Sequence, residues 1–520
     1  MSMEASPFQG GVGVRSLLRK PLAASVVLLL ATLVLLWANA YSPSGLTLRA
    51  LQLTTVLFVV ACTLTTTIGL SRAWRGRADL RFPIVFISVL VLIVLSLHFY
   101  TISVPATQDC YDKTKGVFGC IMDEVYYVPA SQNILSGTQC APYQDNCNLE
   151  HPFLGKAFVA AGIATFGLTD FGWRFFQVVL GTASLPLLFA VVMKLSGDRR
   201  MAYYSALLLA GDTMFFVHSG AALIDVQPIF FALTAFLLYL LNLRIWKIDS
   251  FLLAGMFMGL AGLSKETAIF LLAALLSYHT IFSRGGFKDW VFSSLKIAIA
   301  AGGVFAVGLE IYDSLYVSAA FPTFLEAIRF MLSYGSGLIG PGWIDPVLNT
   351  SITPLSWLTF YSPVGYFLTH VTTTITAGSS QTQLVYTEVG YYGVTNMLVV
   401  WTIFAWVPYV LYEAIRGRRG SAGVAEPLSR SLQTGLFAFV WFAWTYFPYF
   451  SLWIYGRVTY PFYFVPAIPA LAMGTSYFIS RSWFSSKIAA VYIVAVFGWF
   501  FLFYSDKSFL PVWLRVLLGK

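Results

Sequence analysis

The chain has 520 residues, of which 58% are hydrophobic and only 11% are charged. Because a soluble globular protein carries roughly 25% charged residues, this composition excludes a soluble domain and predicts a polytopic membrane protein. The formal charge of +9 does not indicate nucleic-acid binding, since the Lys and Arg residues lie in short loops between apolar runs, as cytoplasmic loops require. The long apolar runs indicate helices, because the strands of a membrane barrel would alternate in polarity.

Apolar runs of about 20 residues, long enough to cross a bilayer, recur along the chain. The first lacks a convincing small-residue cleavage site, so we do not expect a cleaved signal peptide. Basic residues fall in alternate loops, which predicts an inside N-terminus and an outside C-terminus. About 13 spans are expected, at residues 21–41, 46–70, 82–104, 173–194, 201–219, 221–243, 251–264, 267–283, 290–312, 394–415, 431–455, 458–480 and 487–505.

These spans divide the chain into an extra N-terminal pair, a core with an external loop, a second external region and a C-terminal set: residues 1–81, 82–312 with loop 105–156, 313–393 and 394–520. Amphipathic pieces of the second external region, such as 321–334, are expected to lie flat on the membrane. This region also holds a small Thr-rich stretch at 372–376. No internal repeat is found, which disfavours a secondary transporter.

Loop 105–156 contains an adjacent pair of carboxylates, Asp123 and Glu124, about twenty residues after a span. Carboxylates are costly beside lipid, so a pair emerging where a span ends needs a reason. Neighbours on a helix point about 100° apart, so one acid is expected to face a reaction centre while the other supports it. The alternative is a solvated helix start, because acids favour a first turn.

A second ionisable cluster, Glu150, His151 and Lys156, lies where the chain re-enters the membrane. Pro152 favours the start of a helix, and Glu150 would lie near its positive end. Together with the first pair, the cluster indicates an active-site loop at the membrane surface. An interfacial cap followed by a snorkelling lysine is the alternative interpretation.

Loop 105–156 also holds four of the five cysteines, namely Cys110, Cys120, Cys140 and Cys147. Four cysteines in an oxidising compartment predict two disulfides, and three pairings are possible. A zinc site is the rival interpretation, but the spacing lacks a C-x₂-C pair.

Three further charged residues, Asp225, Lys265 and Arg457, lie at the expected outer ends of later spans. Ionisable groups at such depth are functional candidates, and an arginine fork suits a phosphate group. The competing interpretations are a local ion pair between Lys265 and Glu266 and an interfacial anchor for Arg457.

The sequence contains no P-loop, dinucleotide fingerprint, nucleophile elbow or H-E-x-x-H motif. Without a nucleotide site, a donor substrate would have to be presented by the membrane itself. We predict no cofactor and no metal, because Lys and Arg can stabilise a phosphate without one, although a divalent ion held by Asp123 and Glu150 is the alternative.

These motifs resemble those of the GT-C superfamily of polyprenyl-phosphate-sugar-dependent glycosyltransferases, above all the protein O-mannosyltransferase family and its aminoarabinose-transferase relatives. The likeness covers about residues 82–505 and is carried by Met122 to Ala130, His151 to Lys156, Trp173-Arg174 with Gly181, Leu223 to Asp225, Gly259 to Lys265 and Arg457 to Pro466. Two positions depart from the family pattern: Ser219-Gly220 stands where a Ser-Arg dipeptide is expected, and Tyr463 stands where the family has His.

The resemblance implies an all-α polytopic GT-C fold and an inverting transfer of a sugar, with mannose expected, from a polyprenyl or dolichyl phosphate to a Ser or Thr hydroxyl of a protein. It implies Asp123 as general base and Glu124 as the residue that orients the acceptor. The substrate-binding set would be Glu150, His151, Lys156, Asp225, Lys265, Arg457 and Tyr463.

Because a large outer domain is missing, the expected location is the plasma membrane of a prokaryote, with the active site on the extracytoplasmic face. The expected partners are the lipid-linked donor, a secreted or membrane protein acceptor and the lipid bilayer, with no nucleic acid. Two alternatives stay open: a sugar transferase acting on a lipid or glycan, and a transporter or flippase of lipid-linked sugars.

Overall fold

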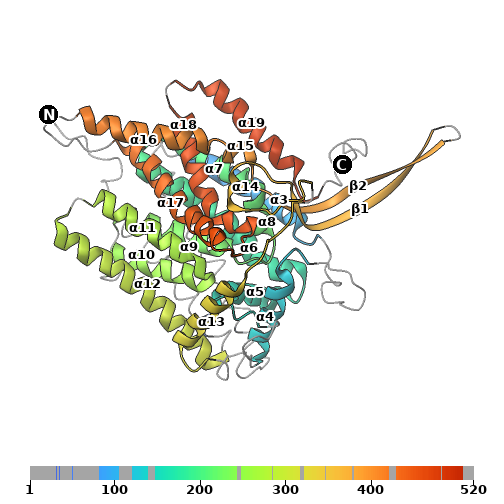
Figure 1. Cartoon of the computed structure of the whole chain (residues 1–520), viewed down its shortest axis with the longest axis horizontal. Coiled ribbons are helices and arrows are strands. Elements are labelled where there is room, and N and C mark those ends of the chain that lie inside the picture. Colours follow the sequence, from blue (N-terminus) through green and yellow to red (C-terminus); the bar gives the residue numbers. More distant parts are fainter. Residues whose placement is uncertain are drawn as a thin grey trace.

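A computed structural model describes residues 31, 34, 50, 81–104, 120–138, 147–242, 248–283, 285–316, 321–345, 347–377, 380–420, 429–481 and 483–506. Helices form the body of the molecule, and a two-stranded antiparallel hairpin projects from one side (Figure 1). The two spans predicted within residues 1–81 fall almost wholly outside the described residues, as do Cys110 and Cys140.

Within the described residues, six helical stretches are long and apolar enough to cross a membrane: Phe82–Thr101, Asp170–Ser196, Phe287–Ser314, Met397–Arg416, Arg430–Ile454 and Pro461–Ile479. Shorter apolar helices accompany them at Leu154–Phe166, Val226–Leu241, Ser250–Ser264, Glu266–Phe282 and Ser486–Leu502. The protein is therefore a mostly helical integral membrane protein, although the predicted number of spans is not established.

The first part of the chain runs through α3 (Arg81–Thr101), α4 (Glu124–Ser136), α5 (Leu154–Phe166), α6 (Asp170–Ser196), α7 (Arg199–Ala210), α8 (Thr213–Gly220), α9 (Val226–Leu241), α10 (Ser250–Ser264), η3 (Glu266–Ala268), α11 (Ile269–Phe282) and α12 (Phe287–Tyr316). The second part runs through α13 (Phe324–Gly337), α14 (Pro354–Leu358), β1 (Val364–Ala377), β2 (Ser380–Gly393), α15 (Met397–Val400), α16 (Ile403–Gly420), α17 (Arg430–Ile454), η4 (Pro461–Ala467), α18 (Ile468–Ile479) and α19 (Ser486–Leu502).

The predicted span 201–219 consists of two helices, α7 and α8, that meet at a buried turn. Asp212 causes the break, because its carboxylate caps α8 by accepting a hydrogen bond from the Phe215 amide at 2.9 Å. Its other oxygen accepts from the Asn396 amide at 2.9 Å. A side chain that caps a helix start cannot continue the preceding helix, so the hydrophobic run is divided.

The second external region contains one element that we predicted and one that we did not. Its amphipathic piece 321–334 corresponds closely to α13. The hairpin was not anticipated: β1 pairs antiparallel with β2, with Phe367 opposite Tyr391 and Thr372 opposite Val385. The β-branched and aromatic residues of these strands fit a pleated surface, and the Thr-rich stretch lies within β1.

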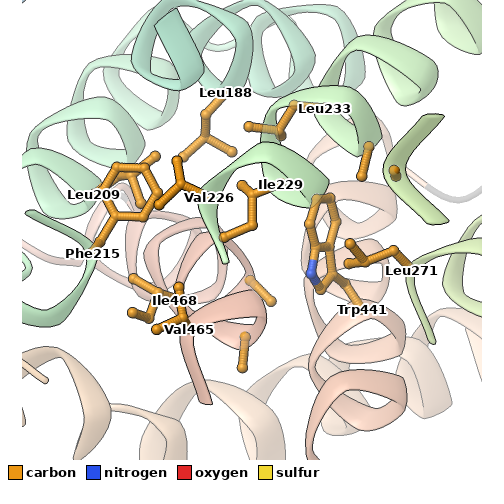
Figure 2. Close-up of a cluster of buried hydrophobic side chains, with 14 of the residues drawn as sticks. Leu188, Leu209, Phe215, Val226, Ile229, Leu233, Leu271, Trp441, Val465 and Ile468 are labelled. Carbon is orange, nitrogen blue, oxygen red and sulfur yellow. The ribbon is translucent and has the colours of Figure 1, made fainter. Parts of the chain in front are cut away.

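The buried apolar core lies where the first and last parts of the chain meet. Figure 2 shows Leu188 of α6, Ile229 of α9 and Leu271 of α11 gathered with Trp441 of α17 and Ile468 of α18, all at most 1% exposed. Helices far apart in sequence therefore pack together in one buried core.

Glycines allow two helices to approach very closely beside this core. A Cβ atom added at Gly255 of α10 would lie 2.4 Å from the Ile297 carbonyl oxygen of α12, and one at Gly259 would lie 2.7 Å from that of Ala301. Small residues permit such backbone contact between membrane helices. The α10–α12 pair forms one wall of the cavity described next.

Candidate active site

A cavity of about 1010 Å³ lies between α4, α10, η3, α11, α12, α13 and the segment that leads into η4. One part of its wall is polar and contains Asp123, Glu150, His151, Glu266 and Arg457. The remaining wall is largely apolar and includes Met258, Gly259, Gly262, Leu272, Ala301, Phe305, Ile328 and Met331. The cavity thus joins a charged end to a groove suited to a hydrocarbon chain.

Asp123 presents a carboxylate to this cavity without a fixed partner. It is the residue before α4, and its side chain caps no amide of that helix. No side-chain hydrogen bond to it is found among the described residues. Burial raises the pKa of Asp123 to about 6, although the charge of Lys265 acts in the opposite direction. A carboxylate of this kind is suited to accept a proton near neutral pH.

A strained turn aims Asp123 at the cavity. The preceding residue, Met122, has a φ of 51°, in the left-handed region that side chains other than glycine seldom adopt. The Glu124 carboxylate holds this turn by accepting a hydrogen bond from the Ile121 amide at 2.9 Å. Such backbone strain persists only where surrounding contacts enforce it, and it clusters at functional sites.

Glu124 itself faces away from the cavity and is fully buried. Arg174 of α6 donates to both of its oxygens, from Nε at 2.7 Å and from Nη2 at 2.8 Å. The Ala222 amide donates a further bond at 2.8 Å. Because a buried charge pair needs saturated hydrogen bonding, Glu124 and Arg174 form a fixed internal support that joins α4, α6 and the loop after α8.

Arg174 also secures the end of α3. Its Nη1 donates to the carbonyl oxygens of Ile102 at 2.9 Å and Val104 at 3.1 Å. The sequence offers one signal for this role, a cation near the start of an apolar span, but our prediction had not included Arg174 among the site residues.

Glu150 and His151 line the cavity, as their pattern suggested. Glu150 accepts a hydrogen bond from the Asn148 amide side chain at 2.8 Å. His151 Nδ1 lies 2.9 Å from an oxygen of Glu266, a cavity residue that our prediction treated only as a partner for Lys265. The contact joins the loop before α5 to η3, more than a hundred residues later in the chain.

Lys156 lies behind this loop and does not line the cavity. Its ammonium is fully buried and donates to the His151 carbonyl oxygen at 2.8 Å, and also to that of Asn148. The sequence resemblance implied substrate binding for this lysine, whereas its contacts shape the loop that carries Glu150 and His151.

Two cysteines of loop 105–156 are described in the structure. Cys120 and Cys147 are each disulfide-bonded.

A buried polar chain also lies outside the cavity wall. Lys265 Nζ donates to Asp225 Oδ1 at 2.5 Å, and His218 Nδ1 lies 3.1 Å from Asp225 Oδ2. His218 Nε2 then lies 3.3 Å from the hydroxyl of Tyr366, at the base of the hairpin. Since Lys265 pairs with Asp225 rather than with Glu266 at hydrogen-bond distance, the local ion pair considered from the sequence is replaced by one between separate elements.

The Lys265 ammonium nevertheless lies close to the cavity wall. It is 5.3 Å from the ring centroid of Phe462 and 6.0 Å from that of Tyr463, and both rings line the cavity. These distances allow cation–π attraction.

Arg457 lines the cavity beside Tyr463. Its Nε donates to the Gly335 carbonyl oxygen at 2.6 Å, and its Nη1 donates to that of Val458 at 3.0 Å. The guanidinium lies 5.6 Å from the Tyr463 ring centroid. Backbone carbonyls therefore fix the plane of the guanidinium at the end of α13 while leaving it on the cavity wall.

The predicted site residues thus separate into two sets. Those on the wall are Asp123, Glu150, His151, Arg457 and Tyr463, and those behind it are Glu124, Lys156, Asp225 and Lys265. Within the described ranges, no cluster of three or more His, Cys, Asp or Glu residues is arranged to hold a metal ion.

Comparison with known proteins relates this chain to one family. Residues 150–309 match the family model described as dolichyl-phosphate-mannose-protein mannosyltransferase. A polyprenol-phosphate-mannose–protein mannosyltransferase of Mycobacterium tuberculosis is 32% identical over 116 residues. That match covers 22% of each protein, so the similar segment spans about a fifth of the curated relative.

Two solved structures share the fold over most of the chain. The Saccharomyces cerevisiae protein O-mannosyltransferase Pmt1-Pmt2 complex bound to the sugar donor has a TM-score of 0.60 at 13% identity, covering 86% of this chain and 91% of that one. ArnT from Cupriavidus metallidurans bound to undecaprenyl phosphate has a TM-score of 0.50 at 14% identity, covering 80% and 63%. This chain therefore shares its fold with these two proteins over most of its length, and its sequence similarity to the mannosyltransferase family lies within residues 150–309.

Proposed function

We propose that this protein transfers a sugar, with mannose expected, from a polyprenyl phosphate to a Ser or Thr hydroxyl of a protein on the extracytoplasmic face of a prokaryotic plasma membrane. One observation carries the proposal: Asp123 lines the cavity with its pKa raised to about 6, where the charged end meets an apolar groove. The matches to mannosyltransferases that use lipid-linked mannose support the choice of donor.

The apolar part of the cavity suits the lipid tail of such a donor. Its wall is formed by α10, α11, α12 and α13, and a Cβ atom added at Gly302 would have no neighbour within 4 Å, which leaves room for a chain. A tail in this groove would bring its phosphate to the charged end. There the planar guanidinium of Arg457 can bind two phosphate oxygens, and the nearby ammonium of Lys265 adds positive potential.

The reaction requires a base on the side of the sugar opposite the phosphate. The acceptor oxygen attacks the anomeric carbon and forms a C–O bond, while the bond from that carbon to the phosphate oxygen breaks. The electron pair leaves with the polyprenyl phosphate, and the hydroxyl proton passes to Asp123. Attack from the face opposite the leaving group inverts the anomeric centre.

The other wall residues have complementary roles in this proposal. Glu150, His151 and Glu266 offer hydrogen-bonding groups for sugar hydroxyls at the polar end. Arg457 and Lys265 stabilise the charge that develops on the leaving phosphate, a type of interaction that typically supplies a large share of catalysis. Glu124 would position Asp123 rather than contact the substrate, because it holds the turn that carries Asp123.

The decisive test is transfer by the purified full-length protein. We would incubate it with mannosyl polyprenyl phosphate and a Ser/Thr-containing peptide and measure the peptide mass. A gain of one hexose that is lost in Asp123→Asn is expected. Asp289→Asn is the matched control, because it neutralises an exposed aspartate in the first turn of α12, remote from the cavity wall.

Two other outcomes would redirect the assignment. Donor binding without transfer to peptide would point to a lipid or glycan acceptor. Absence of donor binding, measured by native mass spectrometry, would remove the basis for a transferase and favour transport of lipid-linked sugars.

A further inference from the structure

The projecting hairpin lacks the support that a stable sheet ordinarily has. Each strand contains 14 residues, a length of about 45 Å when extended. It extends well beyond the helical body in Figure 1. A two-stranded hairpin is marginal by itself in water and usually gains stability from a third strand or a packed face. The hairpin therefore has the form of an incomplete sheet.

Among the described residues, the outer edge of β1 lacks the charges, prolines and covering segments that ordinarily prevent pairing. Natural edge strands are protected by charges, prolines, covering segments or short length. Strand β1 contains no Asp, Glu, Lys, Arg or Pro. Among the described residues, no backbone group of β1 makes a hydrogen bond outside the hairpin. Its register irregularities lie in the first half of the strand, at Gly365/Phe367 and Thr369/His370, and the half beyond His370 pairs regularly.

The opposite edge differs because the chain itself covers its base. The Gly390 amide of β2 donates to the Ser505 carbonyl oxygen at 2.8 Å, and Val389 forms an isolated bridge with Asp506. Among the described residues, a third strand that reaches the base of the hairpin would therefore meet an occupied edge at β2 and an open one at β1.

The open edge begins beside the candidate active site. Tyr366 of β1 lies 3.3 Å from His218 Nε2, within the polar chain that ends at Lys265. Its ring centroid is 6.0 Å from that of Trp343, and Trp343 lines the cavity. Burial raises the pKa of Tyr366 well above its ordinary value, and the charges of Tyr361, Asp225 and Asp123 add to the shift.

We propose that the outer edge of β1 binds the acceptor polypeptide as an added β-strand and guides it to the cavity. The proposal rests on the protein acceptor proposed above and specifies how that acceptor is recognised. Main-chain hydrogen bonds supply affinity in strand addition, whereas side chains contribute mainly where pockets meet them. An uncharged edge would accept extended segments of varied sequence and keep their Ser and Thr side chains accessible.

The choice of a polypeptide follows from the position of the edge. An extended chain added to β1 enters at Trp343, where the cavity wall starts, so that its end can reach the polar part of the site. A second copy of this protein pairing along the same edge would close the entrance to the added strand. These two occupants consequently predict opposite effects on transfer to long peptides.

The test compares a long and a short acceptor peptide in the wild type and in a hairpin-shortened variant. The variant replaces residues 370–387 with Asn-Gly and retains Tyr366 and Tyr391 at the base. We expect the KM for a peptide of about 20 residues to rise about tenfold or more, while transfer to a peptide of about five residues is unchanged. An unchanged KM for the long peptide would overturn the proposal.

A second measurement uses the intact protein and needs no variant. N-methylation of alternate residues in the long peptide removes main-chain donors from one edge without changing the acceptor hydroxyl. We expect one alternate set to raise the KM and the other set to have little effect. Equal effects of the two sets on the KM would contradict strand addition. The proposal would also be contradicted if shortening the hairpin changed the oligomer mass and left the KM for the long peptide unchanged. If the donor binds but neither peptide is modified, the proposed function itself has failed.

Discussion

The cavity wall and the layer behind it use charged residues in contrasting ways. On the wall, Asp123 has no side-chain hydrogen bond among the described residues, and Glu150 accepts one there, from Asn148. Behind it, the carboxylate of Glu124 accepts four hydrogen bonds, two from Arg174 and two from backbone amides. The two acids Asp123 and Glu150 on the wall therefore keep unused bonding capacity, whereas the carboxylate of Glu124, which positions Asp123, is saturated.

The adjacent pair Asp123 and Glu124 shows this contrast within a single turn. Among the described residues the Asp123 carboxylate makes no side-chain hydrogen bond, so it is available to a substrate at the cavity. The Glu124 carboxylate is fixed in place, because Arg174 and two backbone amides would be left unsatisfied without it. Loss of the first should therefore affect chemistry, and loss of the second should affect stability.

The largest expected effect follows from Asp123→Asn. Because this change removes the proposed base but preserves shape, we expect kcat to fall about 10²–10⁴-fold with little change in the unfolding temperature. Single-turnover transfer and thermal unfolding, measured on the same preparation, check both parts. A loss of folding without a specific loss of chemistry would place Asp123 with the supporting layer instead.

Glu124→Gln should have the complementary result. It leaves Arg174 buried without its counter-charge, and breaking a buried pair in this way typically costs about 3–5 kcal/mol. Denaturant unfolding in detergent micelles would measure the loss. The double variant Glu124→Leu/Arg174→Leu should recover part of the stability, since no unpaired charge remains. Unchanged stability in the single variant would contradict the supporting role.

Arg457→Gln should have a smaller effect, confined to donor use. A hydrogen bond to a charged group contributes about 1.5–3 kcal/mol, so the KM for the lipid-linked sugar should rise about 10- to 100-fold. Arg457→Lys should lie between this variant and the wild type, because it keeps the charge but loses the planar fork. Titration of donor at saturating peptide distinguishes the three proteins. A purely lower kcat would argue against ground-state phosphate binding.

The mildest test is a change of pH. Since burial raises the pKa of Asp123 to about 6, the ionised base is abundant above this pH and is lost below it. We expect kcat/KM to be level above about pH 7 and to fall about tenfold per unit below pH 6. The residual activity of Asp123→Asn should lack this inflection. An acid limb retained in that variant would assign the titration to another group.

Several features of the site follow from short-range pattern and were predicted from the sequence. Asp123, Glu150, His151 and Arg457 stand out because charge is costly near lipid, and each lies on the cavity wall. The amphipathic piece that becomes α13 was also evident from composition. Their roles in binding or catalysis stay predictions, whereas their position on one cavity wall is what the structure shows.

The chain by itself determined the membrane class, the helical character and the presence of charged residues near the ends of apolar runs. Only the tertiary structure decided that Arg174 pairs with Glu124, that Lys265 pairs with Asp225, and that the Thr-rich stretch forms a hairpin. The reason is physical: ion pairs between helices and the pairing of strands depend on which segments meet in space. A hydropathy pattern records only how each segment meets lipid or water.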